Sequence, residues 1–577
     1  MGTPFSSCTK LPDDDTQGSG TAAANASGEG AETVKAQGAP ATKSAASTTS
    51  AAHGGPPQQP TLDASAWLLS QAEMNKSRGG VDRKDLSVSS AGNHIELFAS
   101  SDAFFASVFR DMEDTSGSDD SIWITGWSLD IDIPLLPLDE DYEKSTLRRV
   151  LERAVVKRDV QVRILLWQNL FDRKRVVAAR DFINNLGVQA AAKGFAVLVF
   201  DDRLPHKLSS HHQKAIVIHK KNELIAYVGG VDLTCDRWDT FEHNHRELRA
   251  ERGIKKDKII DGWIDGSARL HGAAAEDVAA NFVGRWNSSN RPCGGLEDEL
   301  LEFQNPSMAK FNPIHEYPHL AIPTDGTTTV QVVRTFSPLY KENGGYQEFA
   351  PQGELSLLEA RVKAIQQAKN FIYIEDQYFF EMPRLMKALR EVLPHIQRVI
   401  VFVQRPTVTT NAKVAGYERL VFAGAKPLLD EFPSKFQIYT TDLSWGLYVH
   451  AKIVIVDDVY LSIGSANWNR RSMTSDSEMA ISVIDSEHQE CPQDKITVGR
   501  LVRGYRLRRI QEKTNVPLET LEKMSLVESL DILGASASDP KSLVDILHVE
   551  SKWEFVLFAS PHTREAVDPD DVEDNTS

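Results

Sequence analysis

From about Leu62 onward, stretches whose apolar residues have helical spacing alternate with short continuous apolar runs. Segment 100–112 has a Ser/Asp start and apolar residues at helical spacing, which predicts an amphipathic helix. Short apolar runs rich in Val, Ile and aromatic residues predict buried strands at 121–130, 160–167, 195–200, 214–218 and 224–230. Helix-length segments separate the earlier runs. Strands that alternate with helices predict an α/β fold.

The same order of elements returns in the second part of the chain. FIYIEDQYFF (371–380), RVIVFVQ (398–404) and FQIYTT (436–441) echo the first three strands, and 449–469 echoes 211–233. Trp123 precedes His212 by 89 residues, and Tyr373 precedes His450 by 77. Matched order and similar spacing indicate an internal duplication of one α/β unit.

Composition sets the expected boundaries. Residues 1–61 are poor in hydrophobic residues and predict a disordered N-terminal arm. We expect a first half at 62–290, a connection rich in Pro, Gly and Asn at 291–330, and a second half at 331–515. A C-terminal extension, 516–577, contains one strand-like run, 553–559, and an acidic end that we expect to be solvated.

Charge and cysteine content narrow the class of protein. The net charge of −17 argues against a protein that coats nucleic acid, because phosphate binding needs a basic face. The four cysteines are far apart and lack metal-ligand spacing. The sequence therefore predicts neither a zinc site nor a disulfide framework. We expect no transmembrane segment and no signal peptide, hence a cytoplasmic protein. The start MGTPFSSCTK allows acylation at Gly2 and Cys8; the alternative is a plain disordered tail.

The second copy carries the sharper chemical pattern: His450-x-Lys452, then Asp457, then Gly-Ser465-x-Asn467. Residues i and i+2 of a strand share a face, so His450 and Lys452 point to the same side. Imidazole, ammonium, hydroxyl and amide groups then converge on one anion, which we expect to be a phosphate.

The first copy repeats the pattern with substitutions. His212 and Lys214 match the histidine and lysine, and Gly230 and Asp232 take the places of the serine and asparagine. His219 stands where the second copy has its aspartate.

The duplicated His-x-Lys-x4-Asp-x6-Gly-Ser-x-Asn arrangement resembles the phospholipase D superfamily over roughly residues 90–515. Further stretches resemble its phosphatidylcholine-cleaving branch; they are VGGVDL, RWDT, 269–287, FIYIEDQYFF, IGSANWNRRSM and 498–510. The resemblance implies two homologous α/β-sandwich halves packed around one shared active site.

The resemblance also implies roles for the motif residues. His212 would be the nucleophile and His450 the general acid and base, with the reverse left open because the motifs are nearly symmetric. Lys214, Lys452, Ser465 and Asn467 would neutralise the phosphoryl oxygens. Asp457 is expected among the catalytic residues as a supporting group. No metal and no cofactor are expected.

Each catalytic imidazole should be oriented by a carboxylate on its far nitrogen. For the second half we expect Glu478, which follows Asn467 by eleven residues. For the first half, Glu247 and Asp265 both remain open. The loss of the acid at His219 should perturb local hydrogen bonding; an inactive first motif is the alternative.

A basic stretch, 498–510, interleaves arginines with apolar residues and predicts an amphipathic helix. It either touches an anionic membrane or packs in the domain with a solvated basic face.

The leading functional hypothesis is a phospholipase D that hydrolyses phosphatidylcholine or a related phospholipid to phosphatidate and transfers the phosphatidyl group to alcohols. The expected partner is a phospholipid membrane surface, contacted peripherally by a monomer. Alternatives are a phosphodiesterase acting on nucleic acid, a cardiolipin-synthase-like transferase, and a pseudoenzyme that binds phospholipid. The net charge and the GGVDL and RWDT features argue against the nuclease.

Overall fold

The computed structural model describes residues 55–189, 194–205, 209–255, 259–290, 305, 312–315, 322–341, 348–406, 415–549 and 568–572. The expected disordered arm up to residue 54, with Gly2 and Cys8, and the strand-like run at 553–559 lie outside these residues. None of the described helices is long and apolar enough to cross a membrane.

The first half contains the helix and all the strands that the hydrophobic pattern predicts. Its strands are β1 (Ser90–Phe98), β2 (Ser121–Gly126), β3 (Gln161–Trp167), β4 (Phe195–Asp201), β5 (Ala215–Lys220), β6 (Glu223–Gly229), β7 (Gly262–Ile264) and β8 (Ser267–His271). Its helices are α3 (Ser101–Glu113), α4 (Leu147–Glu152), α5 (Arg173–Gln189), α6 (Arg246–Glu251) and α7 (Ala273–Asn287). Strands β1, β7 and β8 are additions to the expected set.

The second half repeats this order. Its strands are β9 (Thr328–Thr335), β10 (Phe371–Asp376), β11 (Arg398–Val403), β12 (Phe436–Thr441), β13 (Leu447–Val449), β14 (Lys452–Val456), β15 (Tyr460–Gly464), β16 (Glu478–Asp485), β17 (His488–Cys491), β18 (Ile496–Gly499) and β19 (Val544–Ile546). Its helices are α8 (Ser356–Gln366), α9 (Pro383–Val392), α10 (Ala415–Glu431), α11 (Arg470–Thr474), α12 (Arg500–Thr514), α13 (Leu518–Leu521) and α14 (Leu526–Ser536).

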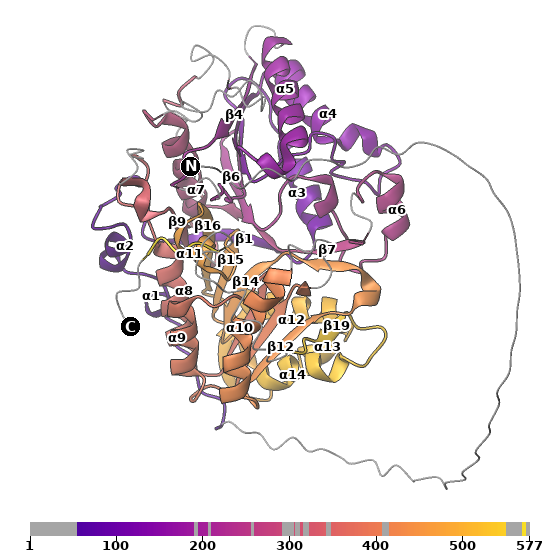
Figure 1. Ribbon diagram of the computed structural model, residues 1–577. Helices are drawn as coiled ribbons and strands as arrows, with labels where there is room; N and C mark the ends of the chain where they lie inside the picture. Colours follow the sequence, from indigo (N-terminus) through magenta and orange to yellow (C-terminus); the bar gives the residue numbers. More distant parts are fainter. Residues whose placement is uncertain are drawn as a thin grey trace, which may run out of the picture. The chain divides into compact units, whose positions relative to one another are not determined.

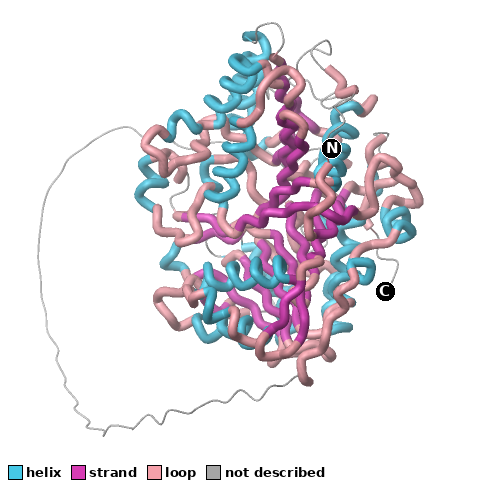
Figure 2. The backbone as a smooth tube through the Cα atoms, turned by 180° about the vertical axis from the view of Figure 1, so that it is seen from behind, coloured by secondary structure: helices cyan, strands magenta, loops and turns pink. Residues whose placement is uncertain are grey.

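A single 15-stranded sheet joins the two halves, in the order β19-β12-β11-β10-β14-β15-β16-β9-β1-β8-β6-β5-β2-β3-β4. Read outward from the central β9–β1 pair, both halves present the same sequence of equivalent strands, so the duplication is a pseudo-twofold in the topology. Figure 1 shows the two halves above and below the β1–β9 junction, and Figure 2 shows their strands as one band with helices on either side. The α/β fold with two homologous halves is therefore confirmed.

Helices cover both faces of this sheet. Apolar residues of α3, α4 and α5 form one core with β2, β3 and β4, and α8, α9 and α10 form the equivalent core in the second half. On the opposite face, α7 and α12 share a third cluster to which both halves contribute. Because this cluster spans the junction, hydrophobic burial holds the halves together.

Two expected boundaries shift in the structure. Helices α1 (Ala64–Trp67) and α2 (Gln71–Ser77) fall within the expected first half but pack on α8 of the second, and Trp67 stacks on Tyr460 with ring centroids 6.0 Å apart. The segment after 515 is no separate extension, since β19 pairs with β12 at the edge of the sheet and α14 packs on α12. Shared apolar surface, which local composition does not reveal, decides both cases.

Charged segments near the C-terminus are buried, contrary to expectation. Within α12, Arg503, Arg506 and Arg509 face inward and form ion pairs, the first two with Asp458 and the third with Glu375. The acidic end is also docked: Asp568 is buried and accepts a hydrogen bond from the backbone N–H of Arg471 at 2.9 Å. Paired charges of opposite sign make such burial tolerable.

Candidate active site

Both motif histidines open onto one pocket of about 530 Å³ between the halves. The pocket is lined by Trp127, Trp167, Phe171, Ser210, His212, Asp232, Arg237, Trp263, Gln377, Tyr378, Phe380, Tyr448, His450, Asn467, Asn469, Arg471, Ser472 and Asp476. His212 immediately precedes the segment that leads into β5, and His450 holds the same place before β14. The sheet topology thus brings together two side chains that are 238 residues apart.

Each histidine is oriented by a carboxylate from the opposite half. His212 Nδ1 lies 2.9 and 3.1 Å from the two oxygens of Glu478, and His450 Nδ1 lies 2.7 Å from Asp265 Oδ2. The backbone follows the same rule: His212 N–H donates to Ser477 O at 2.9 Å and His450 N–H to Ile264 O at 2.8 Å. Since Nδ1 is occupied in both rings, Nε2 is the nitrogen left for chemistry.

This crossed pairing corrects the expected assignment. Glu478 serves His212 instead of His450, and Asp265 is its counterpart, serving His450. The register shows the equivalence, since Gly230 N–H donates to Gly266 O just as Ser465 N–H donates to Met479 O. Glu247, the other candidate, is exposed on α6. Its spacing was misleading because 32 residues, 233–264, separate Asp232 from Asp265, whereas ten, 468–477, separate Asn467 from Glu478.

Burial sets the charge state of these groups. Desolvation, reinforced by the nearby lysines, lowers the pKa of both His212 and His450 well below 6.5, so both rings are neutral near pH 7. Burial also raises the pKa of Asp265 and of Glu478 to about 7. The two His–carboxylate pairs therefore hold neutral imidazoles, the form required of a nucleophile.

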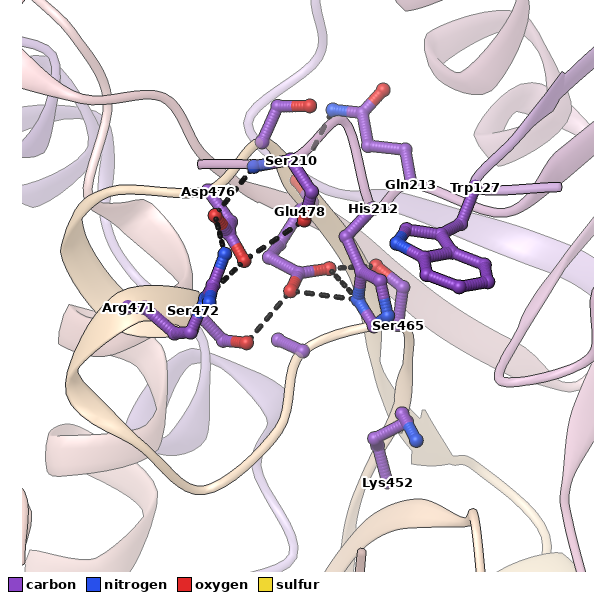
Figure 3. A network of polar contacts seen from close by, with 12 residues as sticks. Trp127, Ser210, His212, Gln213, Lys452, Ser465, Arg471, Ser472, Asp476 and Glu478 are labelled. Carbon is purple, nitrogen blue, oxygen red and sulfur yellow. Dashed lines mark hydrogen bonds and ion pairs between the residues drawn. The ribbon is translucent and has the colours of Figure 1, made fainter. Parts of the chain in front are cut away.

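Hydroxyl groups hold Glu478 in place (Figure 3). Ser465 Oγ donates to Oε2 of Glu478, and Ser472 Oγ donates to Oε1 at 2.7 Å. Ser465 is fully buried, so its hydroxyl orients the carboxylate and does not converge on the phosphate, as the sequence had led us to expect. Asn467, by contrast, lines the pocket as expected.

The two motif lysines lie behind their histidines. Lys214 Nζ donates to the carbonyl of His212 at 3.1 Å and pairs with Asp232 Oδ2 at 3.2 Å. Lys452 Nζ donates to the carbonyl of His450 and to Gln377 Oε1 at 3.2 Å. Desolvation lowers the pKa of Lys452 to about 8. Both ammonium groups therefore act on the pocket through the backbone and the local potential.

Gly230 occupies the place of Ser465 because no side chain fits there. A Cβ at Gly230 would lie 2.1 Å from Asp265 Oδ1. The first half thus combines a glycine with the carboxylate of Asp265 where the second half combines a serine with Glu478. Asp232, in the place of Asn467, accepts the Trp127 N–H at 3.0 Å and forms part of the pocket wall.

Gly230→Ala is expected to displace Asp265 and release His450. A shift of about 1 Å in a catalytic group costs on the order of 100-fold in rate, so we expect at least that loss in kcat with little change in KM. Steady-state kinetics measures it, with Gly55→Ala as the control because Gly55 is exposed and a Cβ there meets no neighbouring atom. Wild-type kcat in Gly230→Ala would contradict the steric argument.

Asp457 and His219 lie away from the pocket. Asp457 accepts the backbone N–H groups of 369–371 at 2.6 to 2.8 Å, at the far end of β14 from His450. Its place among the catalytic groups is thereby corrected: it fixes the start of β10. His219 lies within β5 and pairs with Ser121 of β2. The Ser121 hydroxyl lies 3.1 Å from His219 Nδ1.

His219→Asp is therefore expected to leave kcat within about threefold of wild type. The substituted position is separated from His212 by the length of β5, roughly 20 Å at 3.3 Å per residue. Comparing kcat and the thermal unfolding midpoint of the two proteins tests this. A loss of kcat at unchanged stability would show that the imidazole participates in catalysis.

Several pocket residues had no assigned role in the sequence. Arg237 of the RWDT stretch lies over the Trp263 ring, 3.7 Å from its centroid, and both line the pocket. Arg471 pairs with Asp476 at 2.8 Å, and Asp476 accepts the Ser210 N–H (Figure 3). The family-like stretches pointed to these positions, but only the fold brings them to the pocket. Among the described residues, no cluster of His, Cys, Asp or Glu could hold a metal ion.

Comparisons with known proteins point to one protein family. The family model "Phospholipase D" matches residues 115–400, and "Cardiolipin synthase, PLD-like domain" matches residues 362–494. Phospholipase D A of Dictyostelium discoideum is 25% identical, over 72% of this chain and 35% of its own length. Phospholipase D alpha 3 of Arabidopsis thaliana is 24% identical, over 72% of this chain and 64% of its own length.

The chain thus spans less than two thirds of the length of these relatives. Among solved structures, the phosphatidylserine synthase of Haemophilus influenzae Rd KW20 is 14% identical, with a TM-score of 0.44 over 68% of this chain and 82% of the other. The family models and the named relatives identify this chain as a member of the phospholipase D superfamily.

Proposed function

We propose that this chain is a phospholipase D, which hydrolyses phosphatidylcholine or a related glycerophospholipid to phosphatidate and transfers the phosphatidyl group to alcohols. The observation that carries the proposal is the pair of neutral histidines that open onto one pocket, each held through Nδ1 by a carboxylate of the other half. Two such groups on either side of a phosphodiester suit in-line displacement.

In the first step, His212 Nε2 attacks phosphorus and the bond to the head-group oxygen breaks. Burial raises the pKa of Asp265 to about 7, so its protonated form donates to Nδ1 of His450 and the neutral ring carries its own proton on Nε2. The leaving alkoxide takes this Nε2 proton, and the proton of Asp265 passes to Nδ1. A phosphohistidine on His212 remains. Glu478 stabilises the positive charge that develops on the His212 ring, because it accepts a hydrogen bond from Nδ1.

In the second step, His450 acts as a base. It removes a proton from water or from an acceptor alcohol, whose oxygen attacks phosphorus and displaces His212. Phosphatidate or a phosphatidyl-alcohol leaves, and both rings return to their starting state. The two cationic groups Lys214 and Lys452 maintain a positive potential around the phosphoryl oxygens throughout.

The pH dependence follows from the groups around His450. The pKa of Asp265, about 7, means that the His450–Asp265 pair loses a proton as pH rises through 7, and Lys452 loses its charge near pH 8. Loss of the proton from the His450–Asp265 pair weakens proton donation to the leaving group. Loss of the Lys452 charge weakens stabilisation of the phosphoryl oxygens. We expect kcat/KM to fall on the alkaline side, between about pH 7 and 9, measured with a monomeric substrate. A profile that stays flat to pH 9 would contradict this assignment.

The proposed activity is tested with phosphatidylcholine vesicles, a primary alcohol and EDTA, with plasmid DNA as a parallel substrate. We expect phosphatidyl-alcohol from the wild type and none from His212→Ala. DNA cleavage without lipid products would assign the pocket to nuclease chemistry, and silence in both arms would favour a lipid-binding pseudoenzyme. As part of the same proposal, the protein acts as a monomer at a phospholipid surface without crossing it.

A further inference from the structure

An exposed apolar turn stands at the mouth of the catalytic pocket. Leu170 is 53% exposed and Phe171 is 80% exposed, and the two are adjacent in the turn Leu170–Asp172 between β3 and α5. Phe171 also lines the pocket that contains His212 and His450. We call Leu170 and Phe171 the apolar tip.

The turn is built to hold these side chains outward. Asn169, fully buried, accepts the N–H groups of Phe171 and Asp172 at 3.0 and 3.2 Å and donates to Trp127 O at 3.1 Å. Asp172 in turn accepts the Ser128 hydroxyl. A turn fixed by these partly buried hydrogen bonds keeps its exposed apolar residues in one place and lowers the entropic cost of docking them.

The tip continues an aromatic wall that leads to the catalytic histidines. The Phe171 ring lies 6.3 Å from that of Trp167, which lies 5.8 Å from that of Trp127. Trp127 and His212 line the same pocket, and both are labelled in Figure 3. Lys174, which is exposed, follows Phe171 by three residues at the start of α5.

Exposed Leu and Phe side chains are unfavourable in water, and a pair of them beside an aromatic pocket is typical of an interaction site. A cation next to apolar side chains suits the phosphate level of a bilayer, with the apolar groups reaching the acyl region. We propose that the apolar tip docks the protein on a phospholipid bilayer and so places the pocket mouth at the head-group layer. This inference rests on the proposed function for its choice of partner.

Docking is tested separately from chemistry in a His212→Ala background. Full-length protein is sedimented with phosphatidylcholine vesicles at physiological salt. Leu170→Ser and Phe171→Ser are each expected to weaken the vesicle partition coefficient by about tenfold, the loss associated with one large apolar side chain. Val188→Ser is the matched control, because Val188 is 67% exposed on the far end of α5, about 20 Å along the helix. It should bind as the parent does.

A second arm uses the active protein with Leu170→Ser, since Leu170 does not line the pocket. Turnover of vesicles should fall about tenfold, while turnover of a short-chain phosphatidylcholine below its critical micelle concentration stays at the wild-type level. Equal losses on both substrates, or unchanged vesicle binding in both tip variants, would overturn the proposal.

Two further outcomes are informative. If the parent forms a dimer that Leu170→Ser dissociates in analytical ultracentrifugation, the tip is a contact between copies and the membrane proposal fails. If the parent binds vesicles through the tip but the active protein cleaves neither lipid substrate, docking stands and the phospholipase activity is rejected.

Discussion

His212→Ala and His450→Ala are each expected to lower kcat for phosphatidylcholine by 10⁴-fold or more. Each variant removes one member of a unit that acts together, so either single loss should cost nearly as much as the double loss. The fold should persist, because both side chains lie at the pocket surface and not in the hydrophobic clusters. Steady-state turnover of the two single variants and the double variant measures the effect.

The control is His219→Ala, which removes an imidazole from the same half away from the pocket. It should retain turnover within about threefold of wild type. If either pocket variant keeps more than a few per cent of wild-type kcat at an unchanged unfolding midpoint, the paired-histidine assignment is wrong.

Glu478→Gln is expected to cost about 10³- to 10⁴-fold in kcat while leaving KM near wild type. Glu478 accepts a hydrogen bond from His212 Nδ1 and from the hydroxyls of Ser465 and Ser472. A glutamine would turn an N–H group toward one of these donors and favour the imidazole tautomer that carries its proton on Nε2. That tautomer has no lone pair with which to attack phosphorus, and a comparable tautomer error costs a serine protease about 10⁴-fold.

Glu247→Gln is the matched control, since Glu247 is exposed on α6. It should behave as wild type. A large loss in Glu247→Gln, or near-normal kcat in Glu478→Gln, would show that the carboxylates do not cross between the halves as the structure places them.

The repeat made the strands around both motifs predictable. Apolar runs bounded by polar residues matched β2 to β6 in the first half and β10, β11, β12, β14 and β15 in the second. The motif spacing also correctly predicted that one pocket contains His212, His450, Asp232 and Asn467. Period and spacing are local properties, and for these elements the local sequence agrees with the global fold.

The carboxylate partners could not be predicted in the same way. Sequence proximity suggested that each half orients its own histidine, whereas the pseudo-twofold sends Glu478 to His212 and Asp265 to His450. Only the sheet register identifies Asp265 as the counterpart of Glu478, because the segment 233–264 is longer than its equivalent, 468–477, and changes the spacing. The burial of the α12 arginines could not be predicted either, because their ion-pair partners, Asp458 and Glu375, are distant in the sequence.

The central claim is tested most directly by locating the covalent intermediate. A phosphatidyl ester with a nitrophenol leaving group needs no general acid, so His450→Ala should form the phosphohistidine but release it slowly for want of a base. Peptide mapping by mass spectrometry is predicted to find the phosphatidyl adduct on His212 in that variant and none in His212→Ala. An adduct on His450, or no adduct in His450→Ala under rapid quench, would contradict the account.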